Sequence, residues 1–503
     1  MRLCAAALLT LACLLFSSPD AGAWQLEGDQ GKLSLSGYGE ARGIAAFDQD
    51  TPDEDPSAEL GLELKGSTGS WLATKVSMRA VHDGKVIDPQ NSSPFTGFDR
   101  VYQDRNPYVN VDEAYVDLYT GKADFRLGIQ KFAWGRLDEM NPTDNLNTED
   151  LTEGGTNDEV DRKIGVPAVK VNLYSDLCNV ELGWVPRFVP YRLPTSEERW
   201  FPGVLQPPEL LDTGTTVGTI PVATSYKDID LPAATMGNSE AGIRVSKYIG
   251  GWDLSVSYFT GYDPMPLTEA AADLTVRMND PLALDYDLST ALTLEPGIHR
   301  MHVYGLDATT TVGSFTVRGE YAYFHNKYFN RTLDSVLKEM VSQERQNQIL
   351  SDFLDAYFDS DGQKTVQVFP LDPQVGLQMD SMKYGLGLDY IYGDSSVSVQ
   401  CIQEFIPDYD EDRPVYFSKN GLDTLLTFLF KQFFLQNTME LNLRAAYGVE
   451  FQDFLIKPSL KYSFTNNLQA TIGVIVIGGK DDDSLFGQFR DNDEAFARVR
   501  CSF

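Results

Sequence analysis

Extended segments in which apolar and polar residues take turns recur along this chain from residue 33 to its last residue. The final one, EAFARVRCSF (494–503), carries Val499, Cys501 and Phe503 on one face and Glu494 with two arginines on the other. Because successive side chains of a strand point to opposite sides, each segment has an apolar and a polar face. A soluble domain turns such an apolar face to a core, whereas a transmembrane barrel turns it to lipid.

The links between these segments fall into two classes, and this division favours the barrel. With the N-terminus placed in the periplasm, the links after even-numbered segments are short: GSTGS, GKAD, SDLCN, IGG, VGS, GDSS, LQN and TNN. The long insertions follow odd-numbered segments: 82–110, 135–162, 189–237, 263–297, 326–380, 409–420 and 479–493. Short periplasmic turns and long outer loops are typical of outer-membrane barrels.

The predicted fold class is therefore all-β, a transmembrane antiparallel up-and-down β-barrel. We count about 18 strands, each near the ~9–11 residues that cross a bilayer at a tilt. About 16 strands would also fit, because the segment 422–435 is the least regular.

The N-terminus has the composition of a secretory signal peptide. Arg2 precedes an apolar run that extends to Phe16, and Ala21-Gly22-Ala23 forms a small-residue cleavage site. No other stretch approaches the ~20 apolar residues of a membrane helix. We expect a signal peptide over 1–23, a barrel over 24–503, and a location in the outer membrane of a Gram-negative bacterium.

One outer insertion has a different period. The stretch DSVLKEMVSQERQNQILSDFLDAYF (334–358) has apolar residues near helical spacing. It predicts a short helix within the 326–380 loop. That helix could lie across the mouth or fold into the lumen, and an ordinary surface loop is the alternative.

Charge and rare residues exclude several functions. The formal net charge of −32 argues against a nucleic-acid partner. Four histidines and three cysteines beyond the leader form no recognisable catalytic set, haem motif or zinc ribbon. We therefore expect no enzyme activity, no cofactor and no metal site.

The stretch RLGIQKFAWGRLDEMNPTDNLN (126–147) resembles a family of porin-like outer-membrane proteins of largely unknown function. In that family a strand reading R-x-G-x-Q…W-G leads into an N-P-x-D loop. LGWVPRFVPYRLP (182–194) and the last twenty or so residues also match, and the matches spread over most of the mature chain. The resemblance implies a barrel with a polar lumen but no substrate. The terminal Phe503 also resembles the signal by which barrel-assembly machinery recognises its clients.

The same stretch contains the first candidate site residues. By parity Arg126, Gln130 and Trp134 share the lumen side and lead to Asn141 and Asp144 in the NPTD turn. The turn could fold inward and narrow the pore. The alternative is a structural corner of the barrel.

Other candidates lie on the strands, where inward positions are rich in basic residues while acids gather in the loops. The candidates on the wall are Arg244, Arg318, Glu320 and Arg444. One interpretation is an anion-favouring pore with an acidic outer mouth. The other is a ladder of interior ion pairs that stabilises the wall.

The predicted function is a porin-like channel for small polar or charged solutes. A second hypothesis is a non-conducting scaffold or sheath for an export or electron-transfer partner. A third is a secreted soluble β-protein that binds polysaccharide. The partners expected for the channel are outer-membrane lipid, barrel-assembly machinery and the solute, with a homo-oligomer left open.

Overall fold

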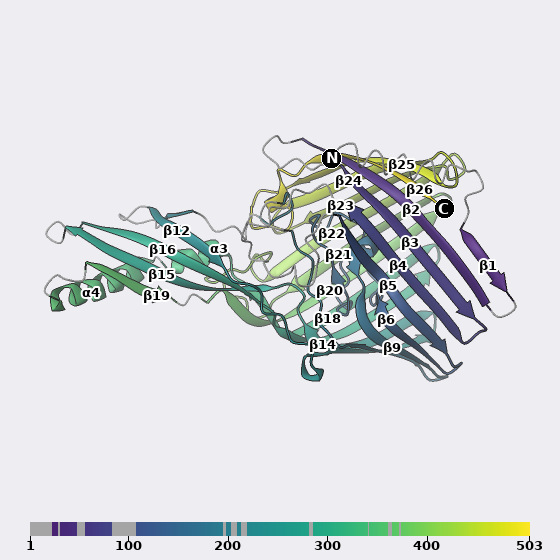
Figure 1. Cartoon of the computed structure of the whole chain (residues 1–503), viewed down its shortest axis with the longest axis horizontal. Helices are drawn as coiled ribbons and strands as arrows, with labels where there is room; N and C mark the ends of the chain where they lie inside the picture. Colours follow the sequence, from purple (N-terminus) through teal and green to yellow (C-terminus); the bar gives the residue numbers. More distant parts are fainter. Residues whose placement is uncertain are drawn as a thin grey trace.

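The computed structural model describes residues 23–28, 31–47, 56–82, 107–194, 198–202, 209–212, 219–280, 285–340, 342–360, 365–371 and 374–503. The expected signal peptide lies almost entirely outside these residues. Figure 1 shows a barrel from which a smaller body projects at one mouth.

A closed antiparallel barrel of 18 strands forms the larger part. Its strands in order are β2 (Gly31–Ala46), β3 (Ser57–Thr68), β4 (Leu72–His82), β5 (Tyr108–Tyr119), β6 (Ala123–Gln130), β9 (Val166–Tyr174), β10 (Asn179–Val185), β13 (Glu240–Ile249), β14 (Trp252–Tyr262), β17 (Arg300–Val312), β18 (Phe315–Asn330), β20 (Gly376–Tyr392), β21 (Ser395–Phe405), β22 (Leu422–Phe434), β23 (Met439–Gly448), β24 (Asp453–Ser463), β25 (Leu468–Gly478) and β26 (Glu494–Ser502).

The barrel closes where the last strand pairs with the first. β26 runs along β2 from Tyr38↔Ser502 to Ala46↔Glu494. The N–H groups of Gly37 and Phe503 each donate to the other's carbonyl, at 3.1 and 2.9 Å. A short strand, β1 (Trp24–Gly28), continues along the same edge of β2 beyond that point. Closure leaves the wall without a free strand edge.

The links follow the predicted parity. At one end of the barrel the chain turns within a few residues, as at 69–71, 250–251 and 393–394. At the other end it makes long excursions, such as 131–165 and 331–375. The doubtful segment 422–435 is a regular strand, β22, so the count of 18 is confirmed.

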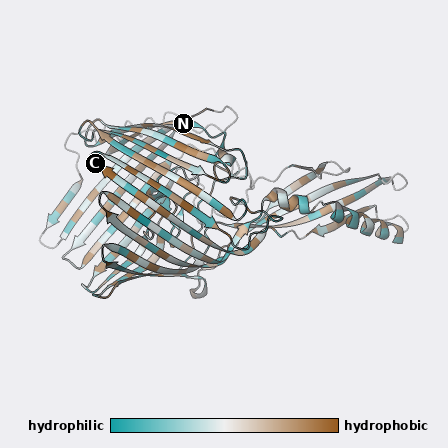
Figure 2. Cartoon of the chain, turned by 180° about the vertical axis from the view of Figure 1, so that it is seen from behind, coloured by the Kyte–Doolittle hydropathy of each residue, from teal (hydrophilic) through white to brown (hydrophobic). Residues whose placement is uncertain are grey.

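The outer face of the wall is apolar. Figure 2 shows apolar and polar residues alternating along the strands. Arg318 and Asp389 form an ion pair on the inner face. Leu386 and Leu388, which have the opposite parity to Asp389 on β20, therefore point outward and are 69% and 44% exposed. Exposed aromatics collect on the outer face beside the short turns, among them Trp252, Phe315, Tyr392, Phe434 and Tyr462.

The projecting body is a second sheet covered by helices. Five strands form it in the order β11 (Leu210–Asp212), β12 (Thr219–Tyr226), β16 (Asp285–Gly297), β15 (Leu267–Asp280) and β19 (Val366–Leu371), with β12 and β16 parallel. The helices α3 (Leu333–Met340) and α4 (Gln343–Asp359) pack on it. Leu274, Leu292, Val336 and Phe353 are each at most 1% exposed in their shared core. This projecting domain is built from the long links after β10, β14 and β18.

The helix predicted over 334–358 is present as two helices, and the apolar residues that predicted it face their core. The two locations predicted for this helix, across the mouth of the barrel or inside its lumen, were wrong. Because α3 and α4 cover the projecting sheet, they neither lie across the mouth nor fill the lumen. The five strands of this sheet were predicted as loops.

Among the described residues, no helix has the length and apolar composition needed to cross a bilayer. The barrel is a single closed wall with exposed apolar side chains rather than two sheets stacked on a core. The soluble hypothesis required the stacked arrangement, so we do not carry it further.

Candidate functional site

The link between β6 and β9, residues 131–165, folds into the barrel and contacts the wall on all sides. We call it the inner segment. It contains the short strands β7 (Thr148–Glu149) and β8 (Lys163–Ile164), which pair with each other, and one helical turn, α2 (Glu159–Arg162). Its side chains or backbone bond residues of β2, β10, β14, β17, β18, β21, β23 and β24.

Apolar packing holds the first part of the inner segment against β10 and β13. Phe132 and Trp134 are 1% and 2% exposed and pack with Leu146, Val185 and Phe259. Trp134 Nε1 donates to Glu181 on β10 at 2.6 Å. A Cβ at Gly242 would lie 2.6 Å from the Trp134 ring, so glycine is required there for the close approach.

The carboxylate of Glu320 on β18 holds the backbone of the inner segment. It accepts the N–H of Leu137 at 2.5 Å, the N–H of Arg136 and the hydroxyl of Thr143 at 3.1 Å. Gly135 has φ +86°, and a Cβ there would lie 2.7 Å from Glu320. Charge-assisted bonds from several donors to one carboxylate fix the backbone in this position.

Two arginines extend this contact in opposite directions. Arg318 on β18 binds both oxygens of Asp138, at 2.9 and 2.7 Å, and also Asp389 of the wall at 2.6 Å. Arg136 of the inner segment binds Asp307 at 2.9 Å and Asp253 at 2.5 Å. Bidentate pairing of this kind gives geometric specificity as well as attraction.

Arg162 organises the second half of the inner segment. Its side chain is 6% exposed and pairs with Glu139 at 2.9 Å and Glu149 at 3.0 Å. It also donates to the carbonyl of Asn157 at 2.7 Å. A buried cation with several acceptors of this kind fixes the path of the surrounding backbone.

Basic residues of the opposite wall hold the far side of the inner segment. Arg444 on β23 pairs with Asp158 and, at 3.3 Å, with Glu139. Lys457 on β24 donates to the carbonyl of Thr156 at 2.7 Å. Burial alone would raise the pKa of Asp158, but Arg444 and Lys457 hold that pKa below its usual value.

A buried ion cluster joins the inner segment to the seam of the barrel. Arg42 on β2 pairs with Glu153 and with Glu494, and Arg199 pairs with Glu494 at 3.3 Å. Arg199 and Glu494 are at most 1% exposed at their side chains. The neighbouring Trp200 packs beside Gly154, so the link after β10 also rests on the inner segment.

The NPTD turn is fixed within the inner segment itself. Asn141 Nδ2 donates to Glu159 at 2.7 Å. Asp144 accepts from Asn147 at 2.8 Å and pairs with Lys163 at 2.7 Å. Burial raises the pKa of Asp144 to about 6, and Lys163 limits that increase. Asn147 also bonds both the N–H and the carbonyl of Phe132, which ties the turn to the start of the inner segment.

The structure brings most of the predicted site residues together. Trp134, Asn141 and Asp144 belong to the inner segment, and Arg318, Glu320 and Arg444 bind it. The three other wall candidates are less directly involved. Arg244 shares Asp307 with Arg136, Arg126 pairs with Asp117 on the neighbouring strand at 2.7 Å, and Gln130 donates to the Ala168 carbonyl at 2.9 Å.

Ion pairs neutralise much of the basic charge on the inner face of the wall. The pairs include Lys75 with Glu113, Arg79 with Asp112, Lys461 with Glu440, and Arg498 and Arg500 with Glu40. This arrangement agrees with the interpretation of a ladder of interior ion pairs that stabilises the wall.

Several residues that fix the inner segment were missed from the sequence. Asp138 and Glu139 lie within the stretch 126–147 but at positions that the motif leaves open, and Arg162 lies beyond it. Asp138 and Glu139 pair with Arg318 and Arg444, which are far away along the chain. The one signal in the sequence is the density of acidic and basic residues in 136–163, which can pair with one another and with the wall.

An 18-stranded barrel with an apolar outer face, an ion-paired interior and a segment folded into its lumen is a porin-like β-barrel in its architecture. The chain belongs to the family described as "Protein of unknown function (DUF1302)", whose model matches residues 73–503. A search of curated proteins finds no match.

Among the solved structures to which the chain is similar is Acinetobacter baumannii OccAB4, with 11% sequence identity, 95% of this chain and 98% of that chain covered, and a TM-score of 0.46. Pseudomonas aeruginosa OccK5 (OpdH) has 9% identity, covers 94% and 98%, and has a TM-score of 0.44. Salmonella typhi OmpF in complex with daunomycin has 10% identity, covers 95% and 100%, and has a TM-score of 0.39.

Proposed function

We propose that this protein is an outer-membrane channel for small polar or charged solutes, and that the inner segment sets its aperture. The observation that carries the proposal is the inner segment itself. It is bonded to opposite walls of a polar lumen, and such a segment leaves only the space around it for passage.

Conductance tests this function directly. Purified protein inserted into planar bilayers should give discrete current steps in potassium chloride. A bilayer that stays silent over many insertions, with protein shown to be folded by its heat-modifiable migration on a gel, would contradict the channel.

The membrane location follows from the apolar outer face and the aromatics beside the short turns. We infer that the short turns face the periplasm, that residues 1–23 direct export, and that barrel-assembly machinery recognises Phe503. The lipid of the outer membrane then covers the outer face.

Leu386→Arg tests the lipid contact. Leu386 lies near the middle of β20 and points outward, so we expect the substitution to lower the free energy of unfolding in lipid vesicles by about 2–4 kcal/mol. Ala271→Arg is the matched control, because Ala271 is exposed on the projecting sheet. The measurement is a denaturant titration in vesicles. An equally small decrease in the free energy of unfolding for both variants would contradict a lipid-facing wall.

The scaffold hypothesis is favoured by a different observation, the projecting domain. Its separate core under two helices is more than a diffusion pore needs. A partner that co-purifies in stoichiometric amount, and is lost when this domain is removed, would support the scaffold function. The mass of the purified protein in detergent would separately show whether it forms a homo-oligomer.

A further inference from the structure

Two cavities line one side of the barrel between its outer mouth and the inner segment. The cavity nearer the mouth, which we call the upper cavity, has a volume of about 720 Å³ and lies among the links 406–421, 449–452 and 479–493. The lower cavity, of about 40 Å³, lies along the upper ends of β20 to β24 and is bounded by Met140 of the inner segment. Phe451 lines both cavities. The two cavities therefore share this ring, and the lower one reaches the inner segment.

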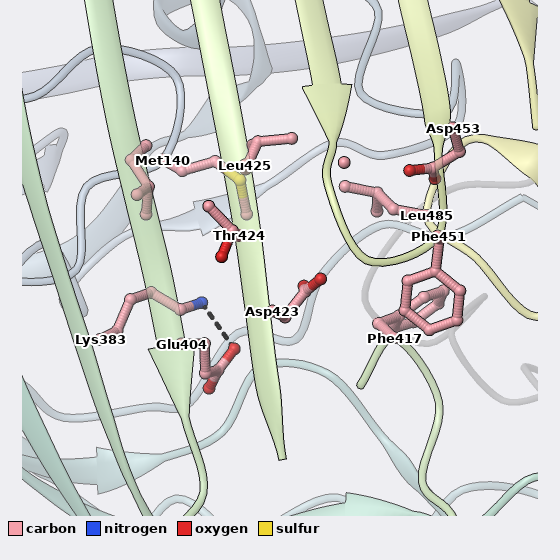
Figure 3. Close-up of a pocket in the computed structure, with 12 residues that line it drawn as sticks. Met140, Lys383, Glu404, Phe417, Asp423, Thr424, Leu425, Phe451, Asp453 and Leu485 are labelled. Atoms are coloured by element: carbon pink, nitrogen blue, oxygen red, sulfur yellow. Dashed lines mark ion pairs between the residues drawn. The ribbon is translucent and has the colours of Figure 1, made fainter. Parts of the chain in front are cut away.

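Two aromatic rings stand at the junction of these cavities. Phe451 is 9% exposed, and Phe417 lines the lower cavity beside it (Figure 3). Phe417 has φ +60°, a left-handed conformation that is rare for a bulky side chain. Backbone strain of this kind persists where the surrounding structure enforces it and is common at functional sites.

The lower cavity holds the carboxylate of Asp423, which lies among other acidic groups. Glu404 and Asp423 are directly opposed on β21 and β22, a like-charge placement that costs stability. Lys327 and Lys383 bind Glu404, at 3.0 and 3.2 Å. Within the part of the chain that the structure describes, the side chain of Asp423 forms no ion pair or hydrogen bond. Its carboxylate points toward Phe417 and Phe451, away from the Lys383–Glu404 pair (Figure 3).

Carboxylates outnumber ammonium groups along the lining of both cavities. Asp453 and Glu450 lie close enough to Asp423 to act on it electrostatically. Around the upper cavity the carboxylates are Glu411, Asp481, Asp482 and Asp483, and the ammonium groups are Lys419 and Lys480. An excess of one sign of charge along a path raises the local concentration of the opposite ion.

We propose that solutes cross the outer half of this barrel along the β21–β24 wall, through these two cavities, and that Asp423 selects cations or solutes with a cationic group. This inference rests on the proposed channel function and adds its route and its charge preference.

Asp423→Asn tests the selectivity with little change of shape. In a gradient of potassium chloride across a planar bilayer, we expect the wild-type reversal potential to show preference for K⁺. The variant should lower the K⁺/Cl⁻ permeability ratio severalfold, and Asp423→Lys should lower it further. Asp176→Asn is the matched control, because Asp176 lies in the exposed short turn 175–178, away from the cavities, and should leave the ratio unchanged.

The route has its own variant. Phe451→Ala removes the ring shared by the two cavities and should raise conductance, whereas Phe464→Ala, at a short turn, should not. If the wild-type protein conducts and the Asp423 variants have the same K⁺/Cl⁻ permeability ratio as the wild type, this inference is overturned while the channel function stands. A wild-type protein that does not conduct overturns both. Heat-modifiable migration of each variant shows that the barrel has formed.

Discussion

Replacing residues 131–165 by an Asn-Gly turn is expected to raise single-channel conductance severalfold. Gln130 and Val166 are directly paired, so β6 and β9 can be joined by a two-residue hairpin without a change of register. The wall then keeps its interstrand hydrogen bonds, while the lumen loses the segment that is bonded across it. Conductance steps in planar bilayers measure the effect.

Removal of α4 provides the control for this deletion. It also removes a segment of a long link, the 17 residues of α4, but α4 packs on the projecting sheet and does not line the lumen. We expect its removal to leave conductance unchanged. A deletion of 131–165 that folds and conducts like the wild type would show that the inner segment does not limit passage.

Arg162→Ala is expected to loosen the inner segment while the wall stays intact. The substitution leaves Glu139, Glu149 and the Asn157 carbonyl without their shared buried cation. Breaking a buried pair by removal of one partner costs about 3–5 kcal/mol. Hydrogen exchange of residues 149–162 should show a decrease of that size in the free energy of local opening, and open-channel current should become noisier.

Arg490→Ala is the matched control, because its pair with Asp482 is exposed and such pairs contribute about 0–1 kcal/mol. Faster exchange in the strands of the wall as well, in the Arg162 variant, would contradict a local role. Unchanged exchange within 149–162 would show that the neighbouring bonds suffice to order the inner segment.

The wall could be predicted from the sequence because each of its strands pairs with its neighbours in the chain. Period-two alternation gives the face of each residue, and a hairpin link gives its partner. Glu494 and Arg498 were placed on the same face, and both are found on the inner side, bonded to Arg42 and Glu40. Even the irregular segment 422–435 was recoverable by this argument.

The path of the inner segment could not be predicted in the same way. Parity places Glu320 on the inner face but gives no information on what it meets there, and its partners are N–H groups of residues 136 and 137. The sequence motif marks where this segment begins. Its course across the lumen is set by bonds between residues that are far apart along the chain.

The projecting sheet was missed for another reason. LTEAAADLTVRMND (267–280) does alternate, and Ala270, Leu274 and Val276 are buried in the structure. The segment lies within the long insertion 263–297, and link length alone assigns it to an outer loop although its residues alternate with the period of a strand. Ser342, which caps α4 by accepting the N–H of Arg345 at 3.4 Å, is likewise a visible start signal within the single predicted helix.

The projecting domain also implies an order of events in biogenesis. Its parallel pair, β12 with β16, and its antiparallel pair, β15 with β19, each join residues from different hairpins. Those residues meet only once β13, β14, β17 and β18 stand side by side, and contacts so distant in sequence form slowly. In the proposed outer-membrane channel, the projecting domain should therefore mature last, after the wall beneath it has been inserted.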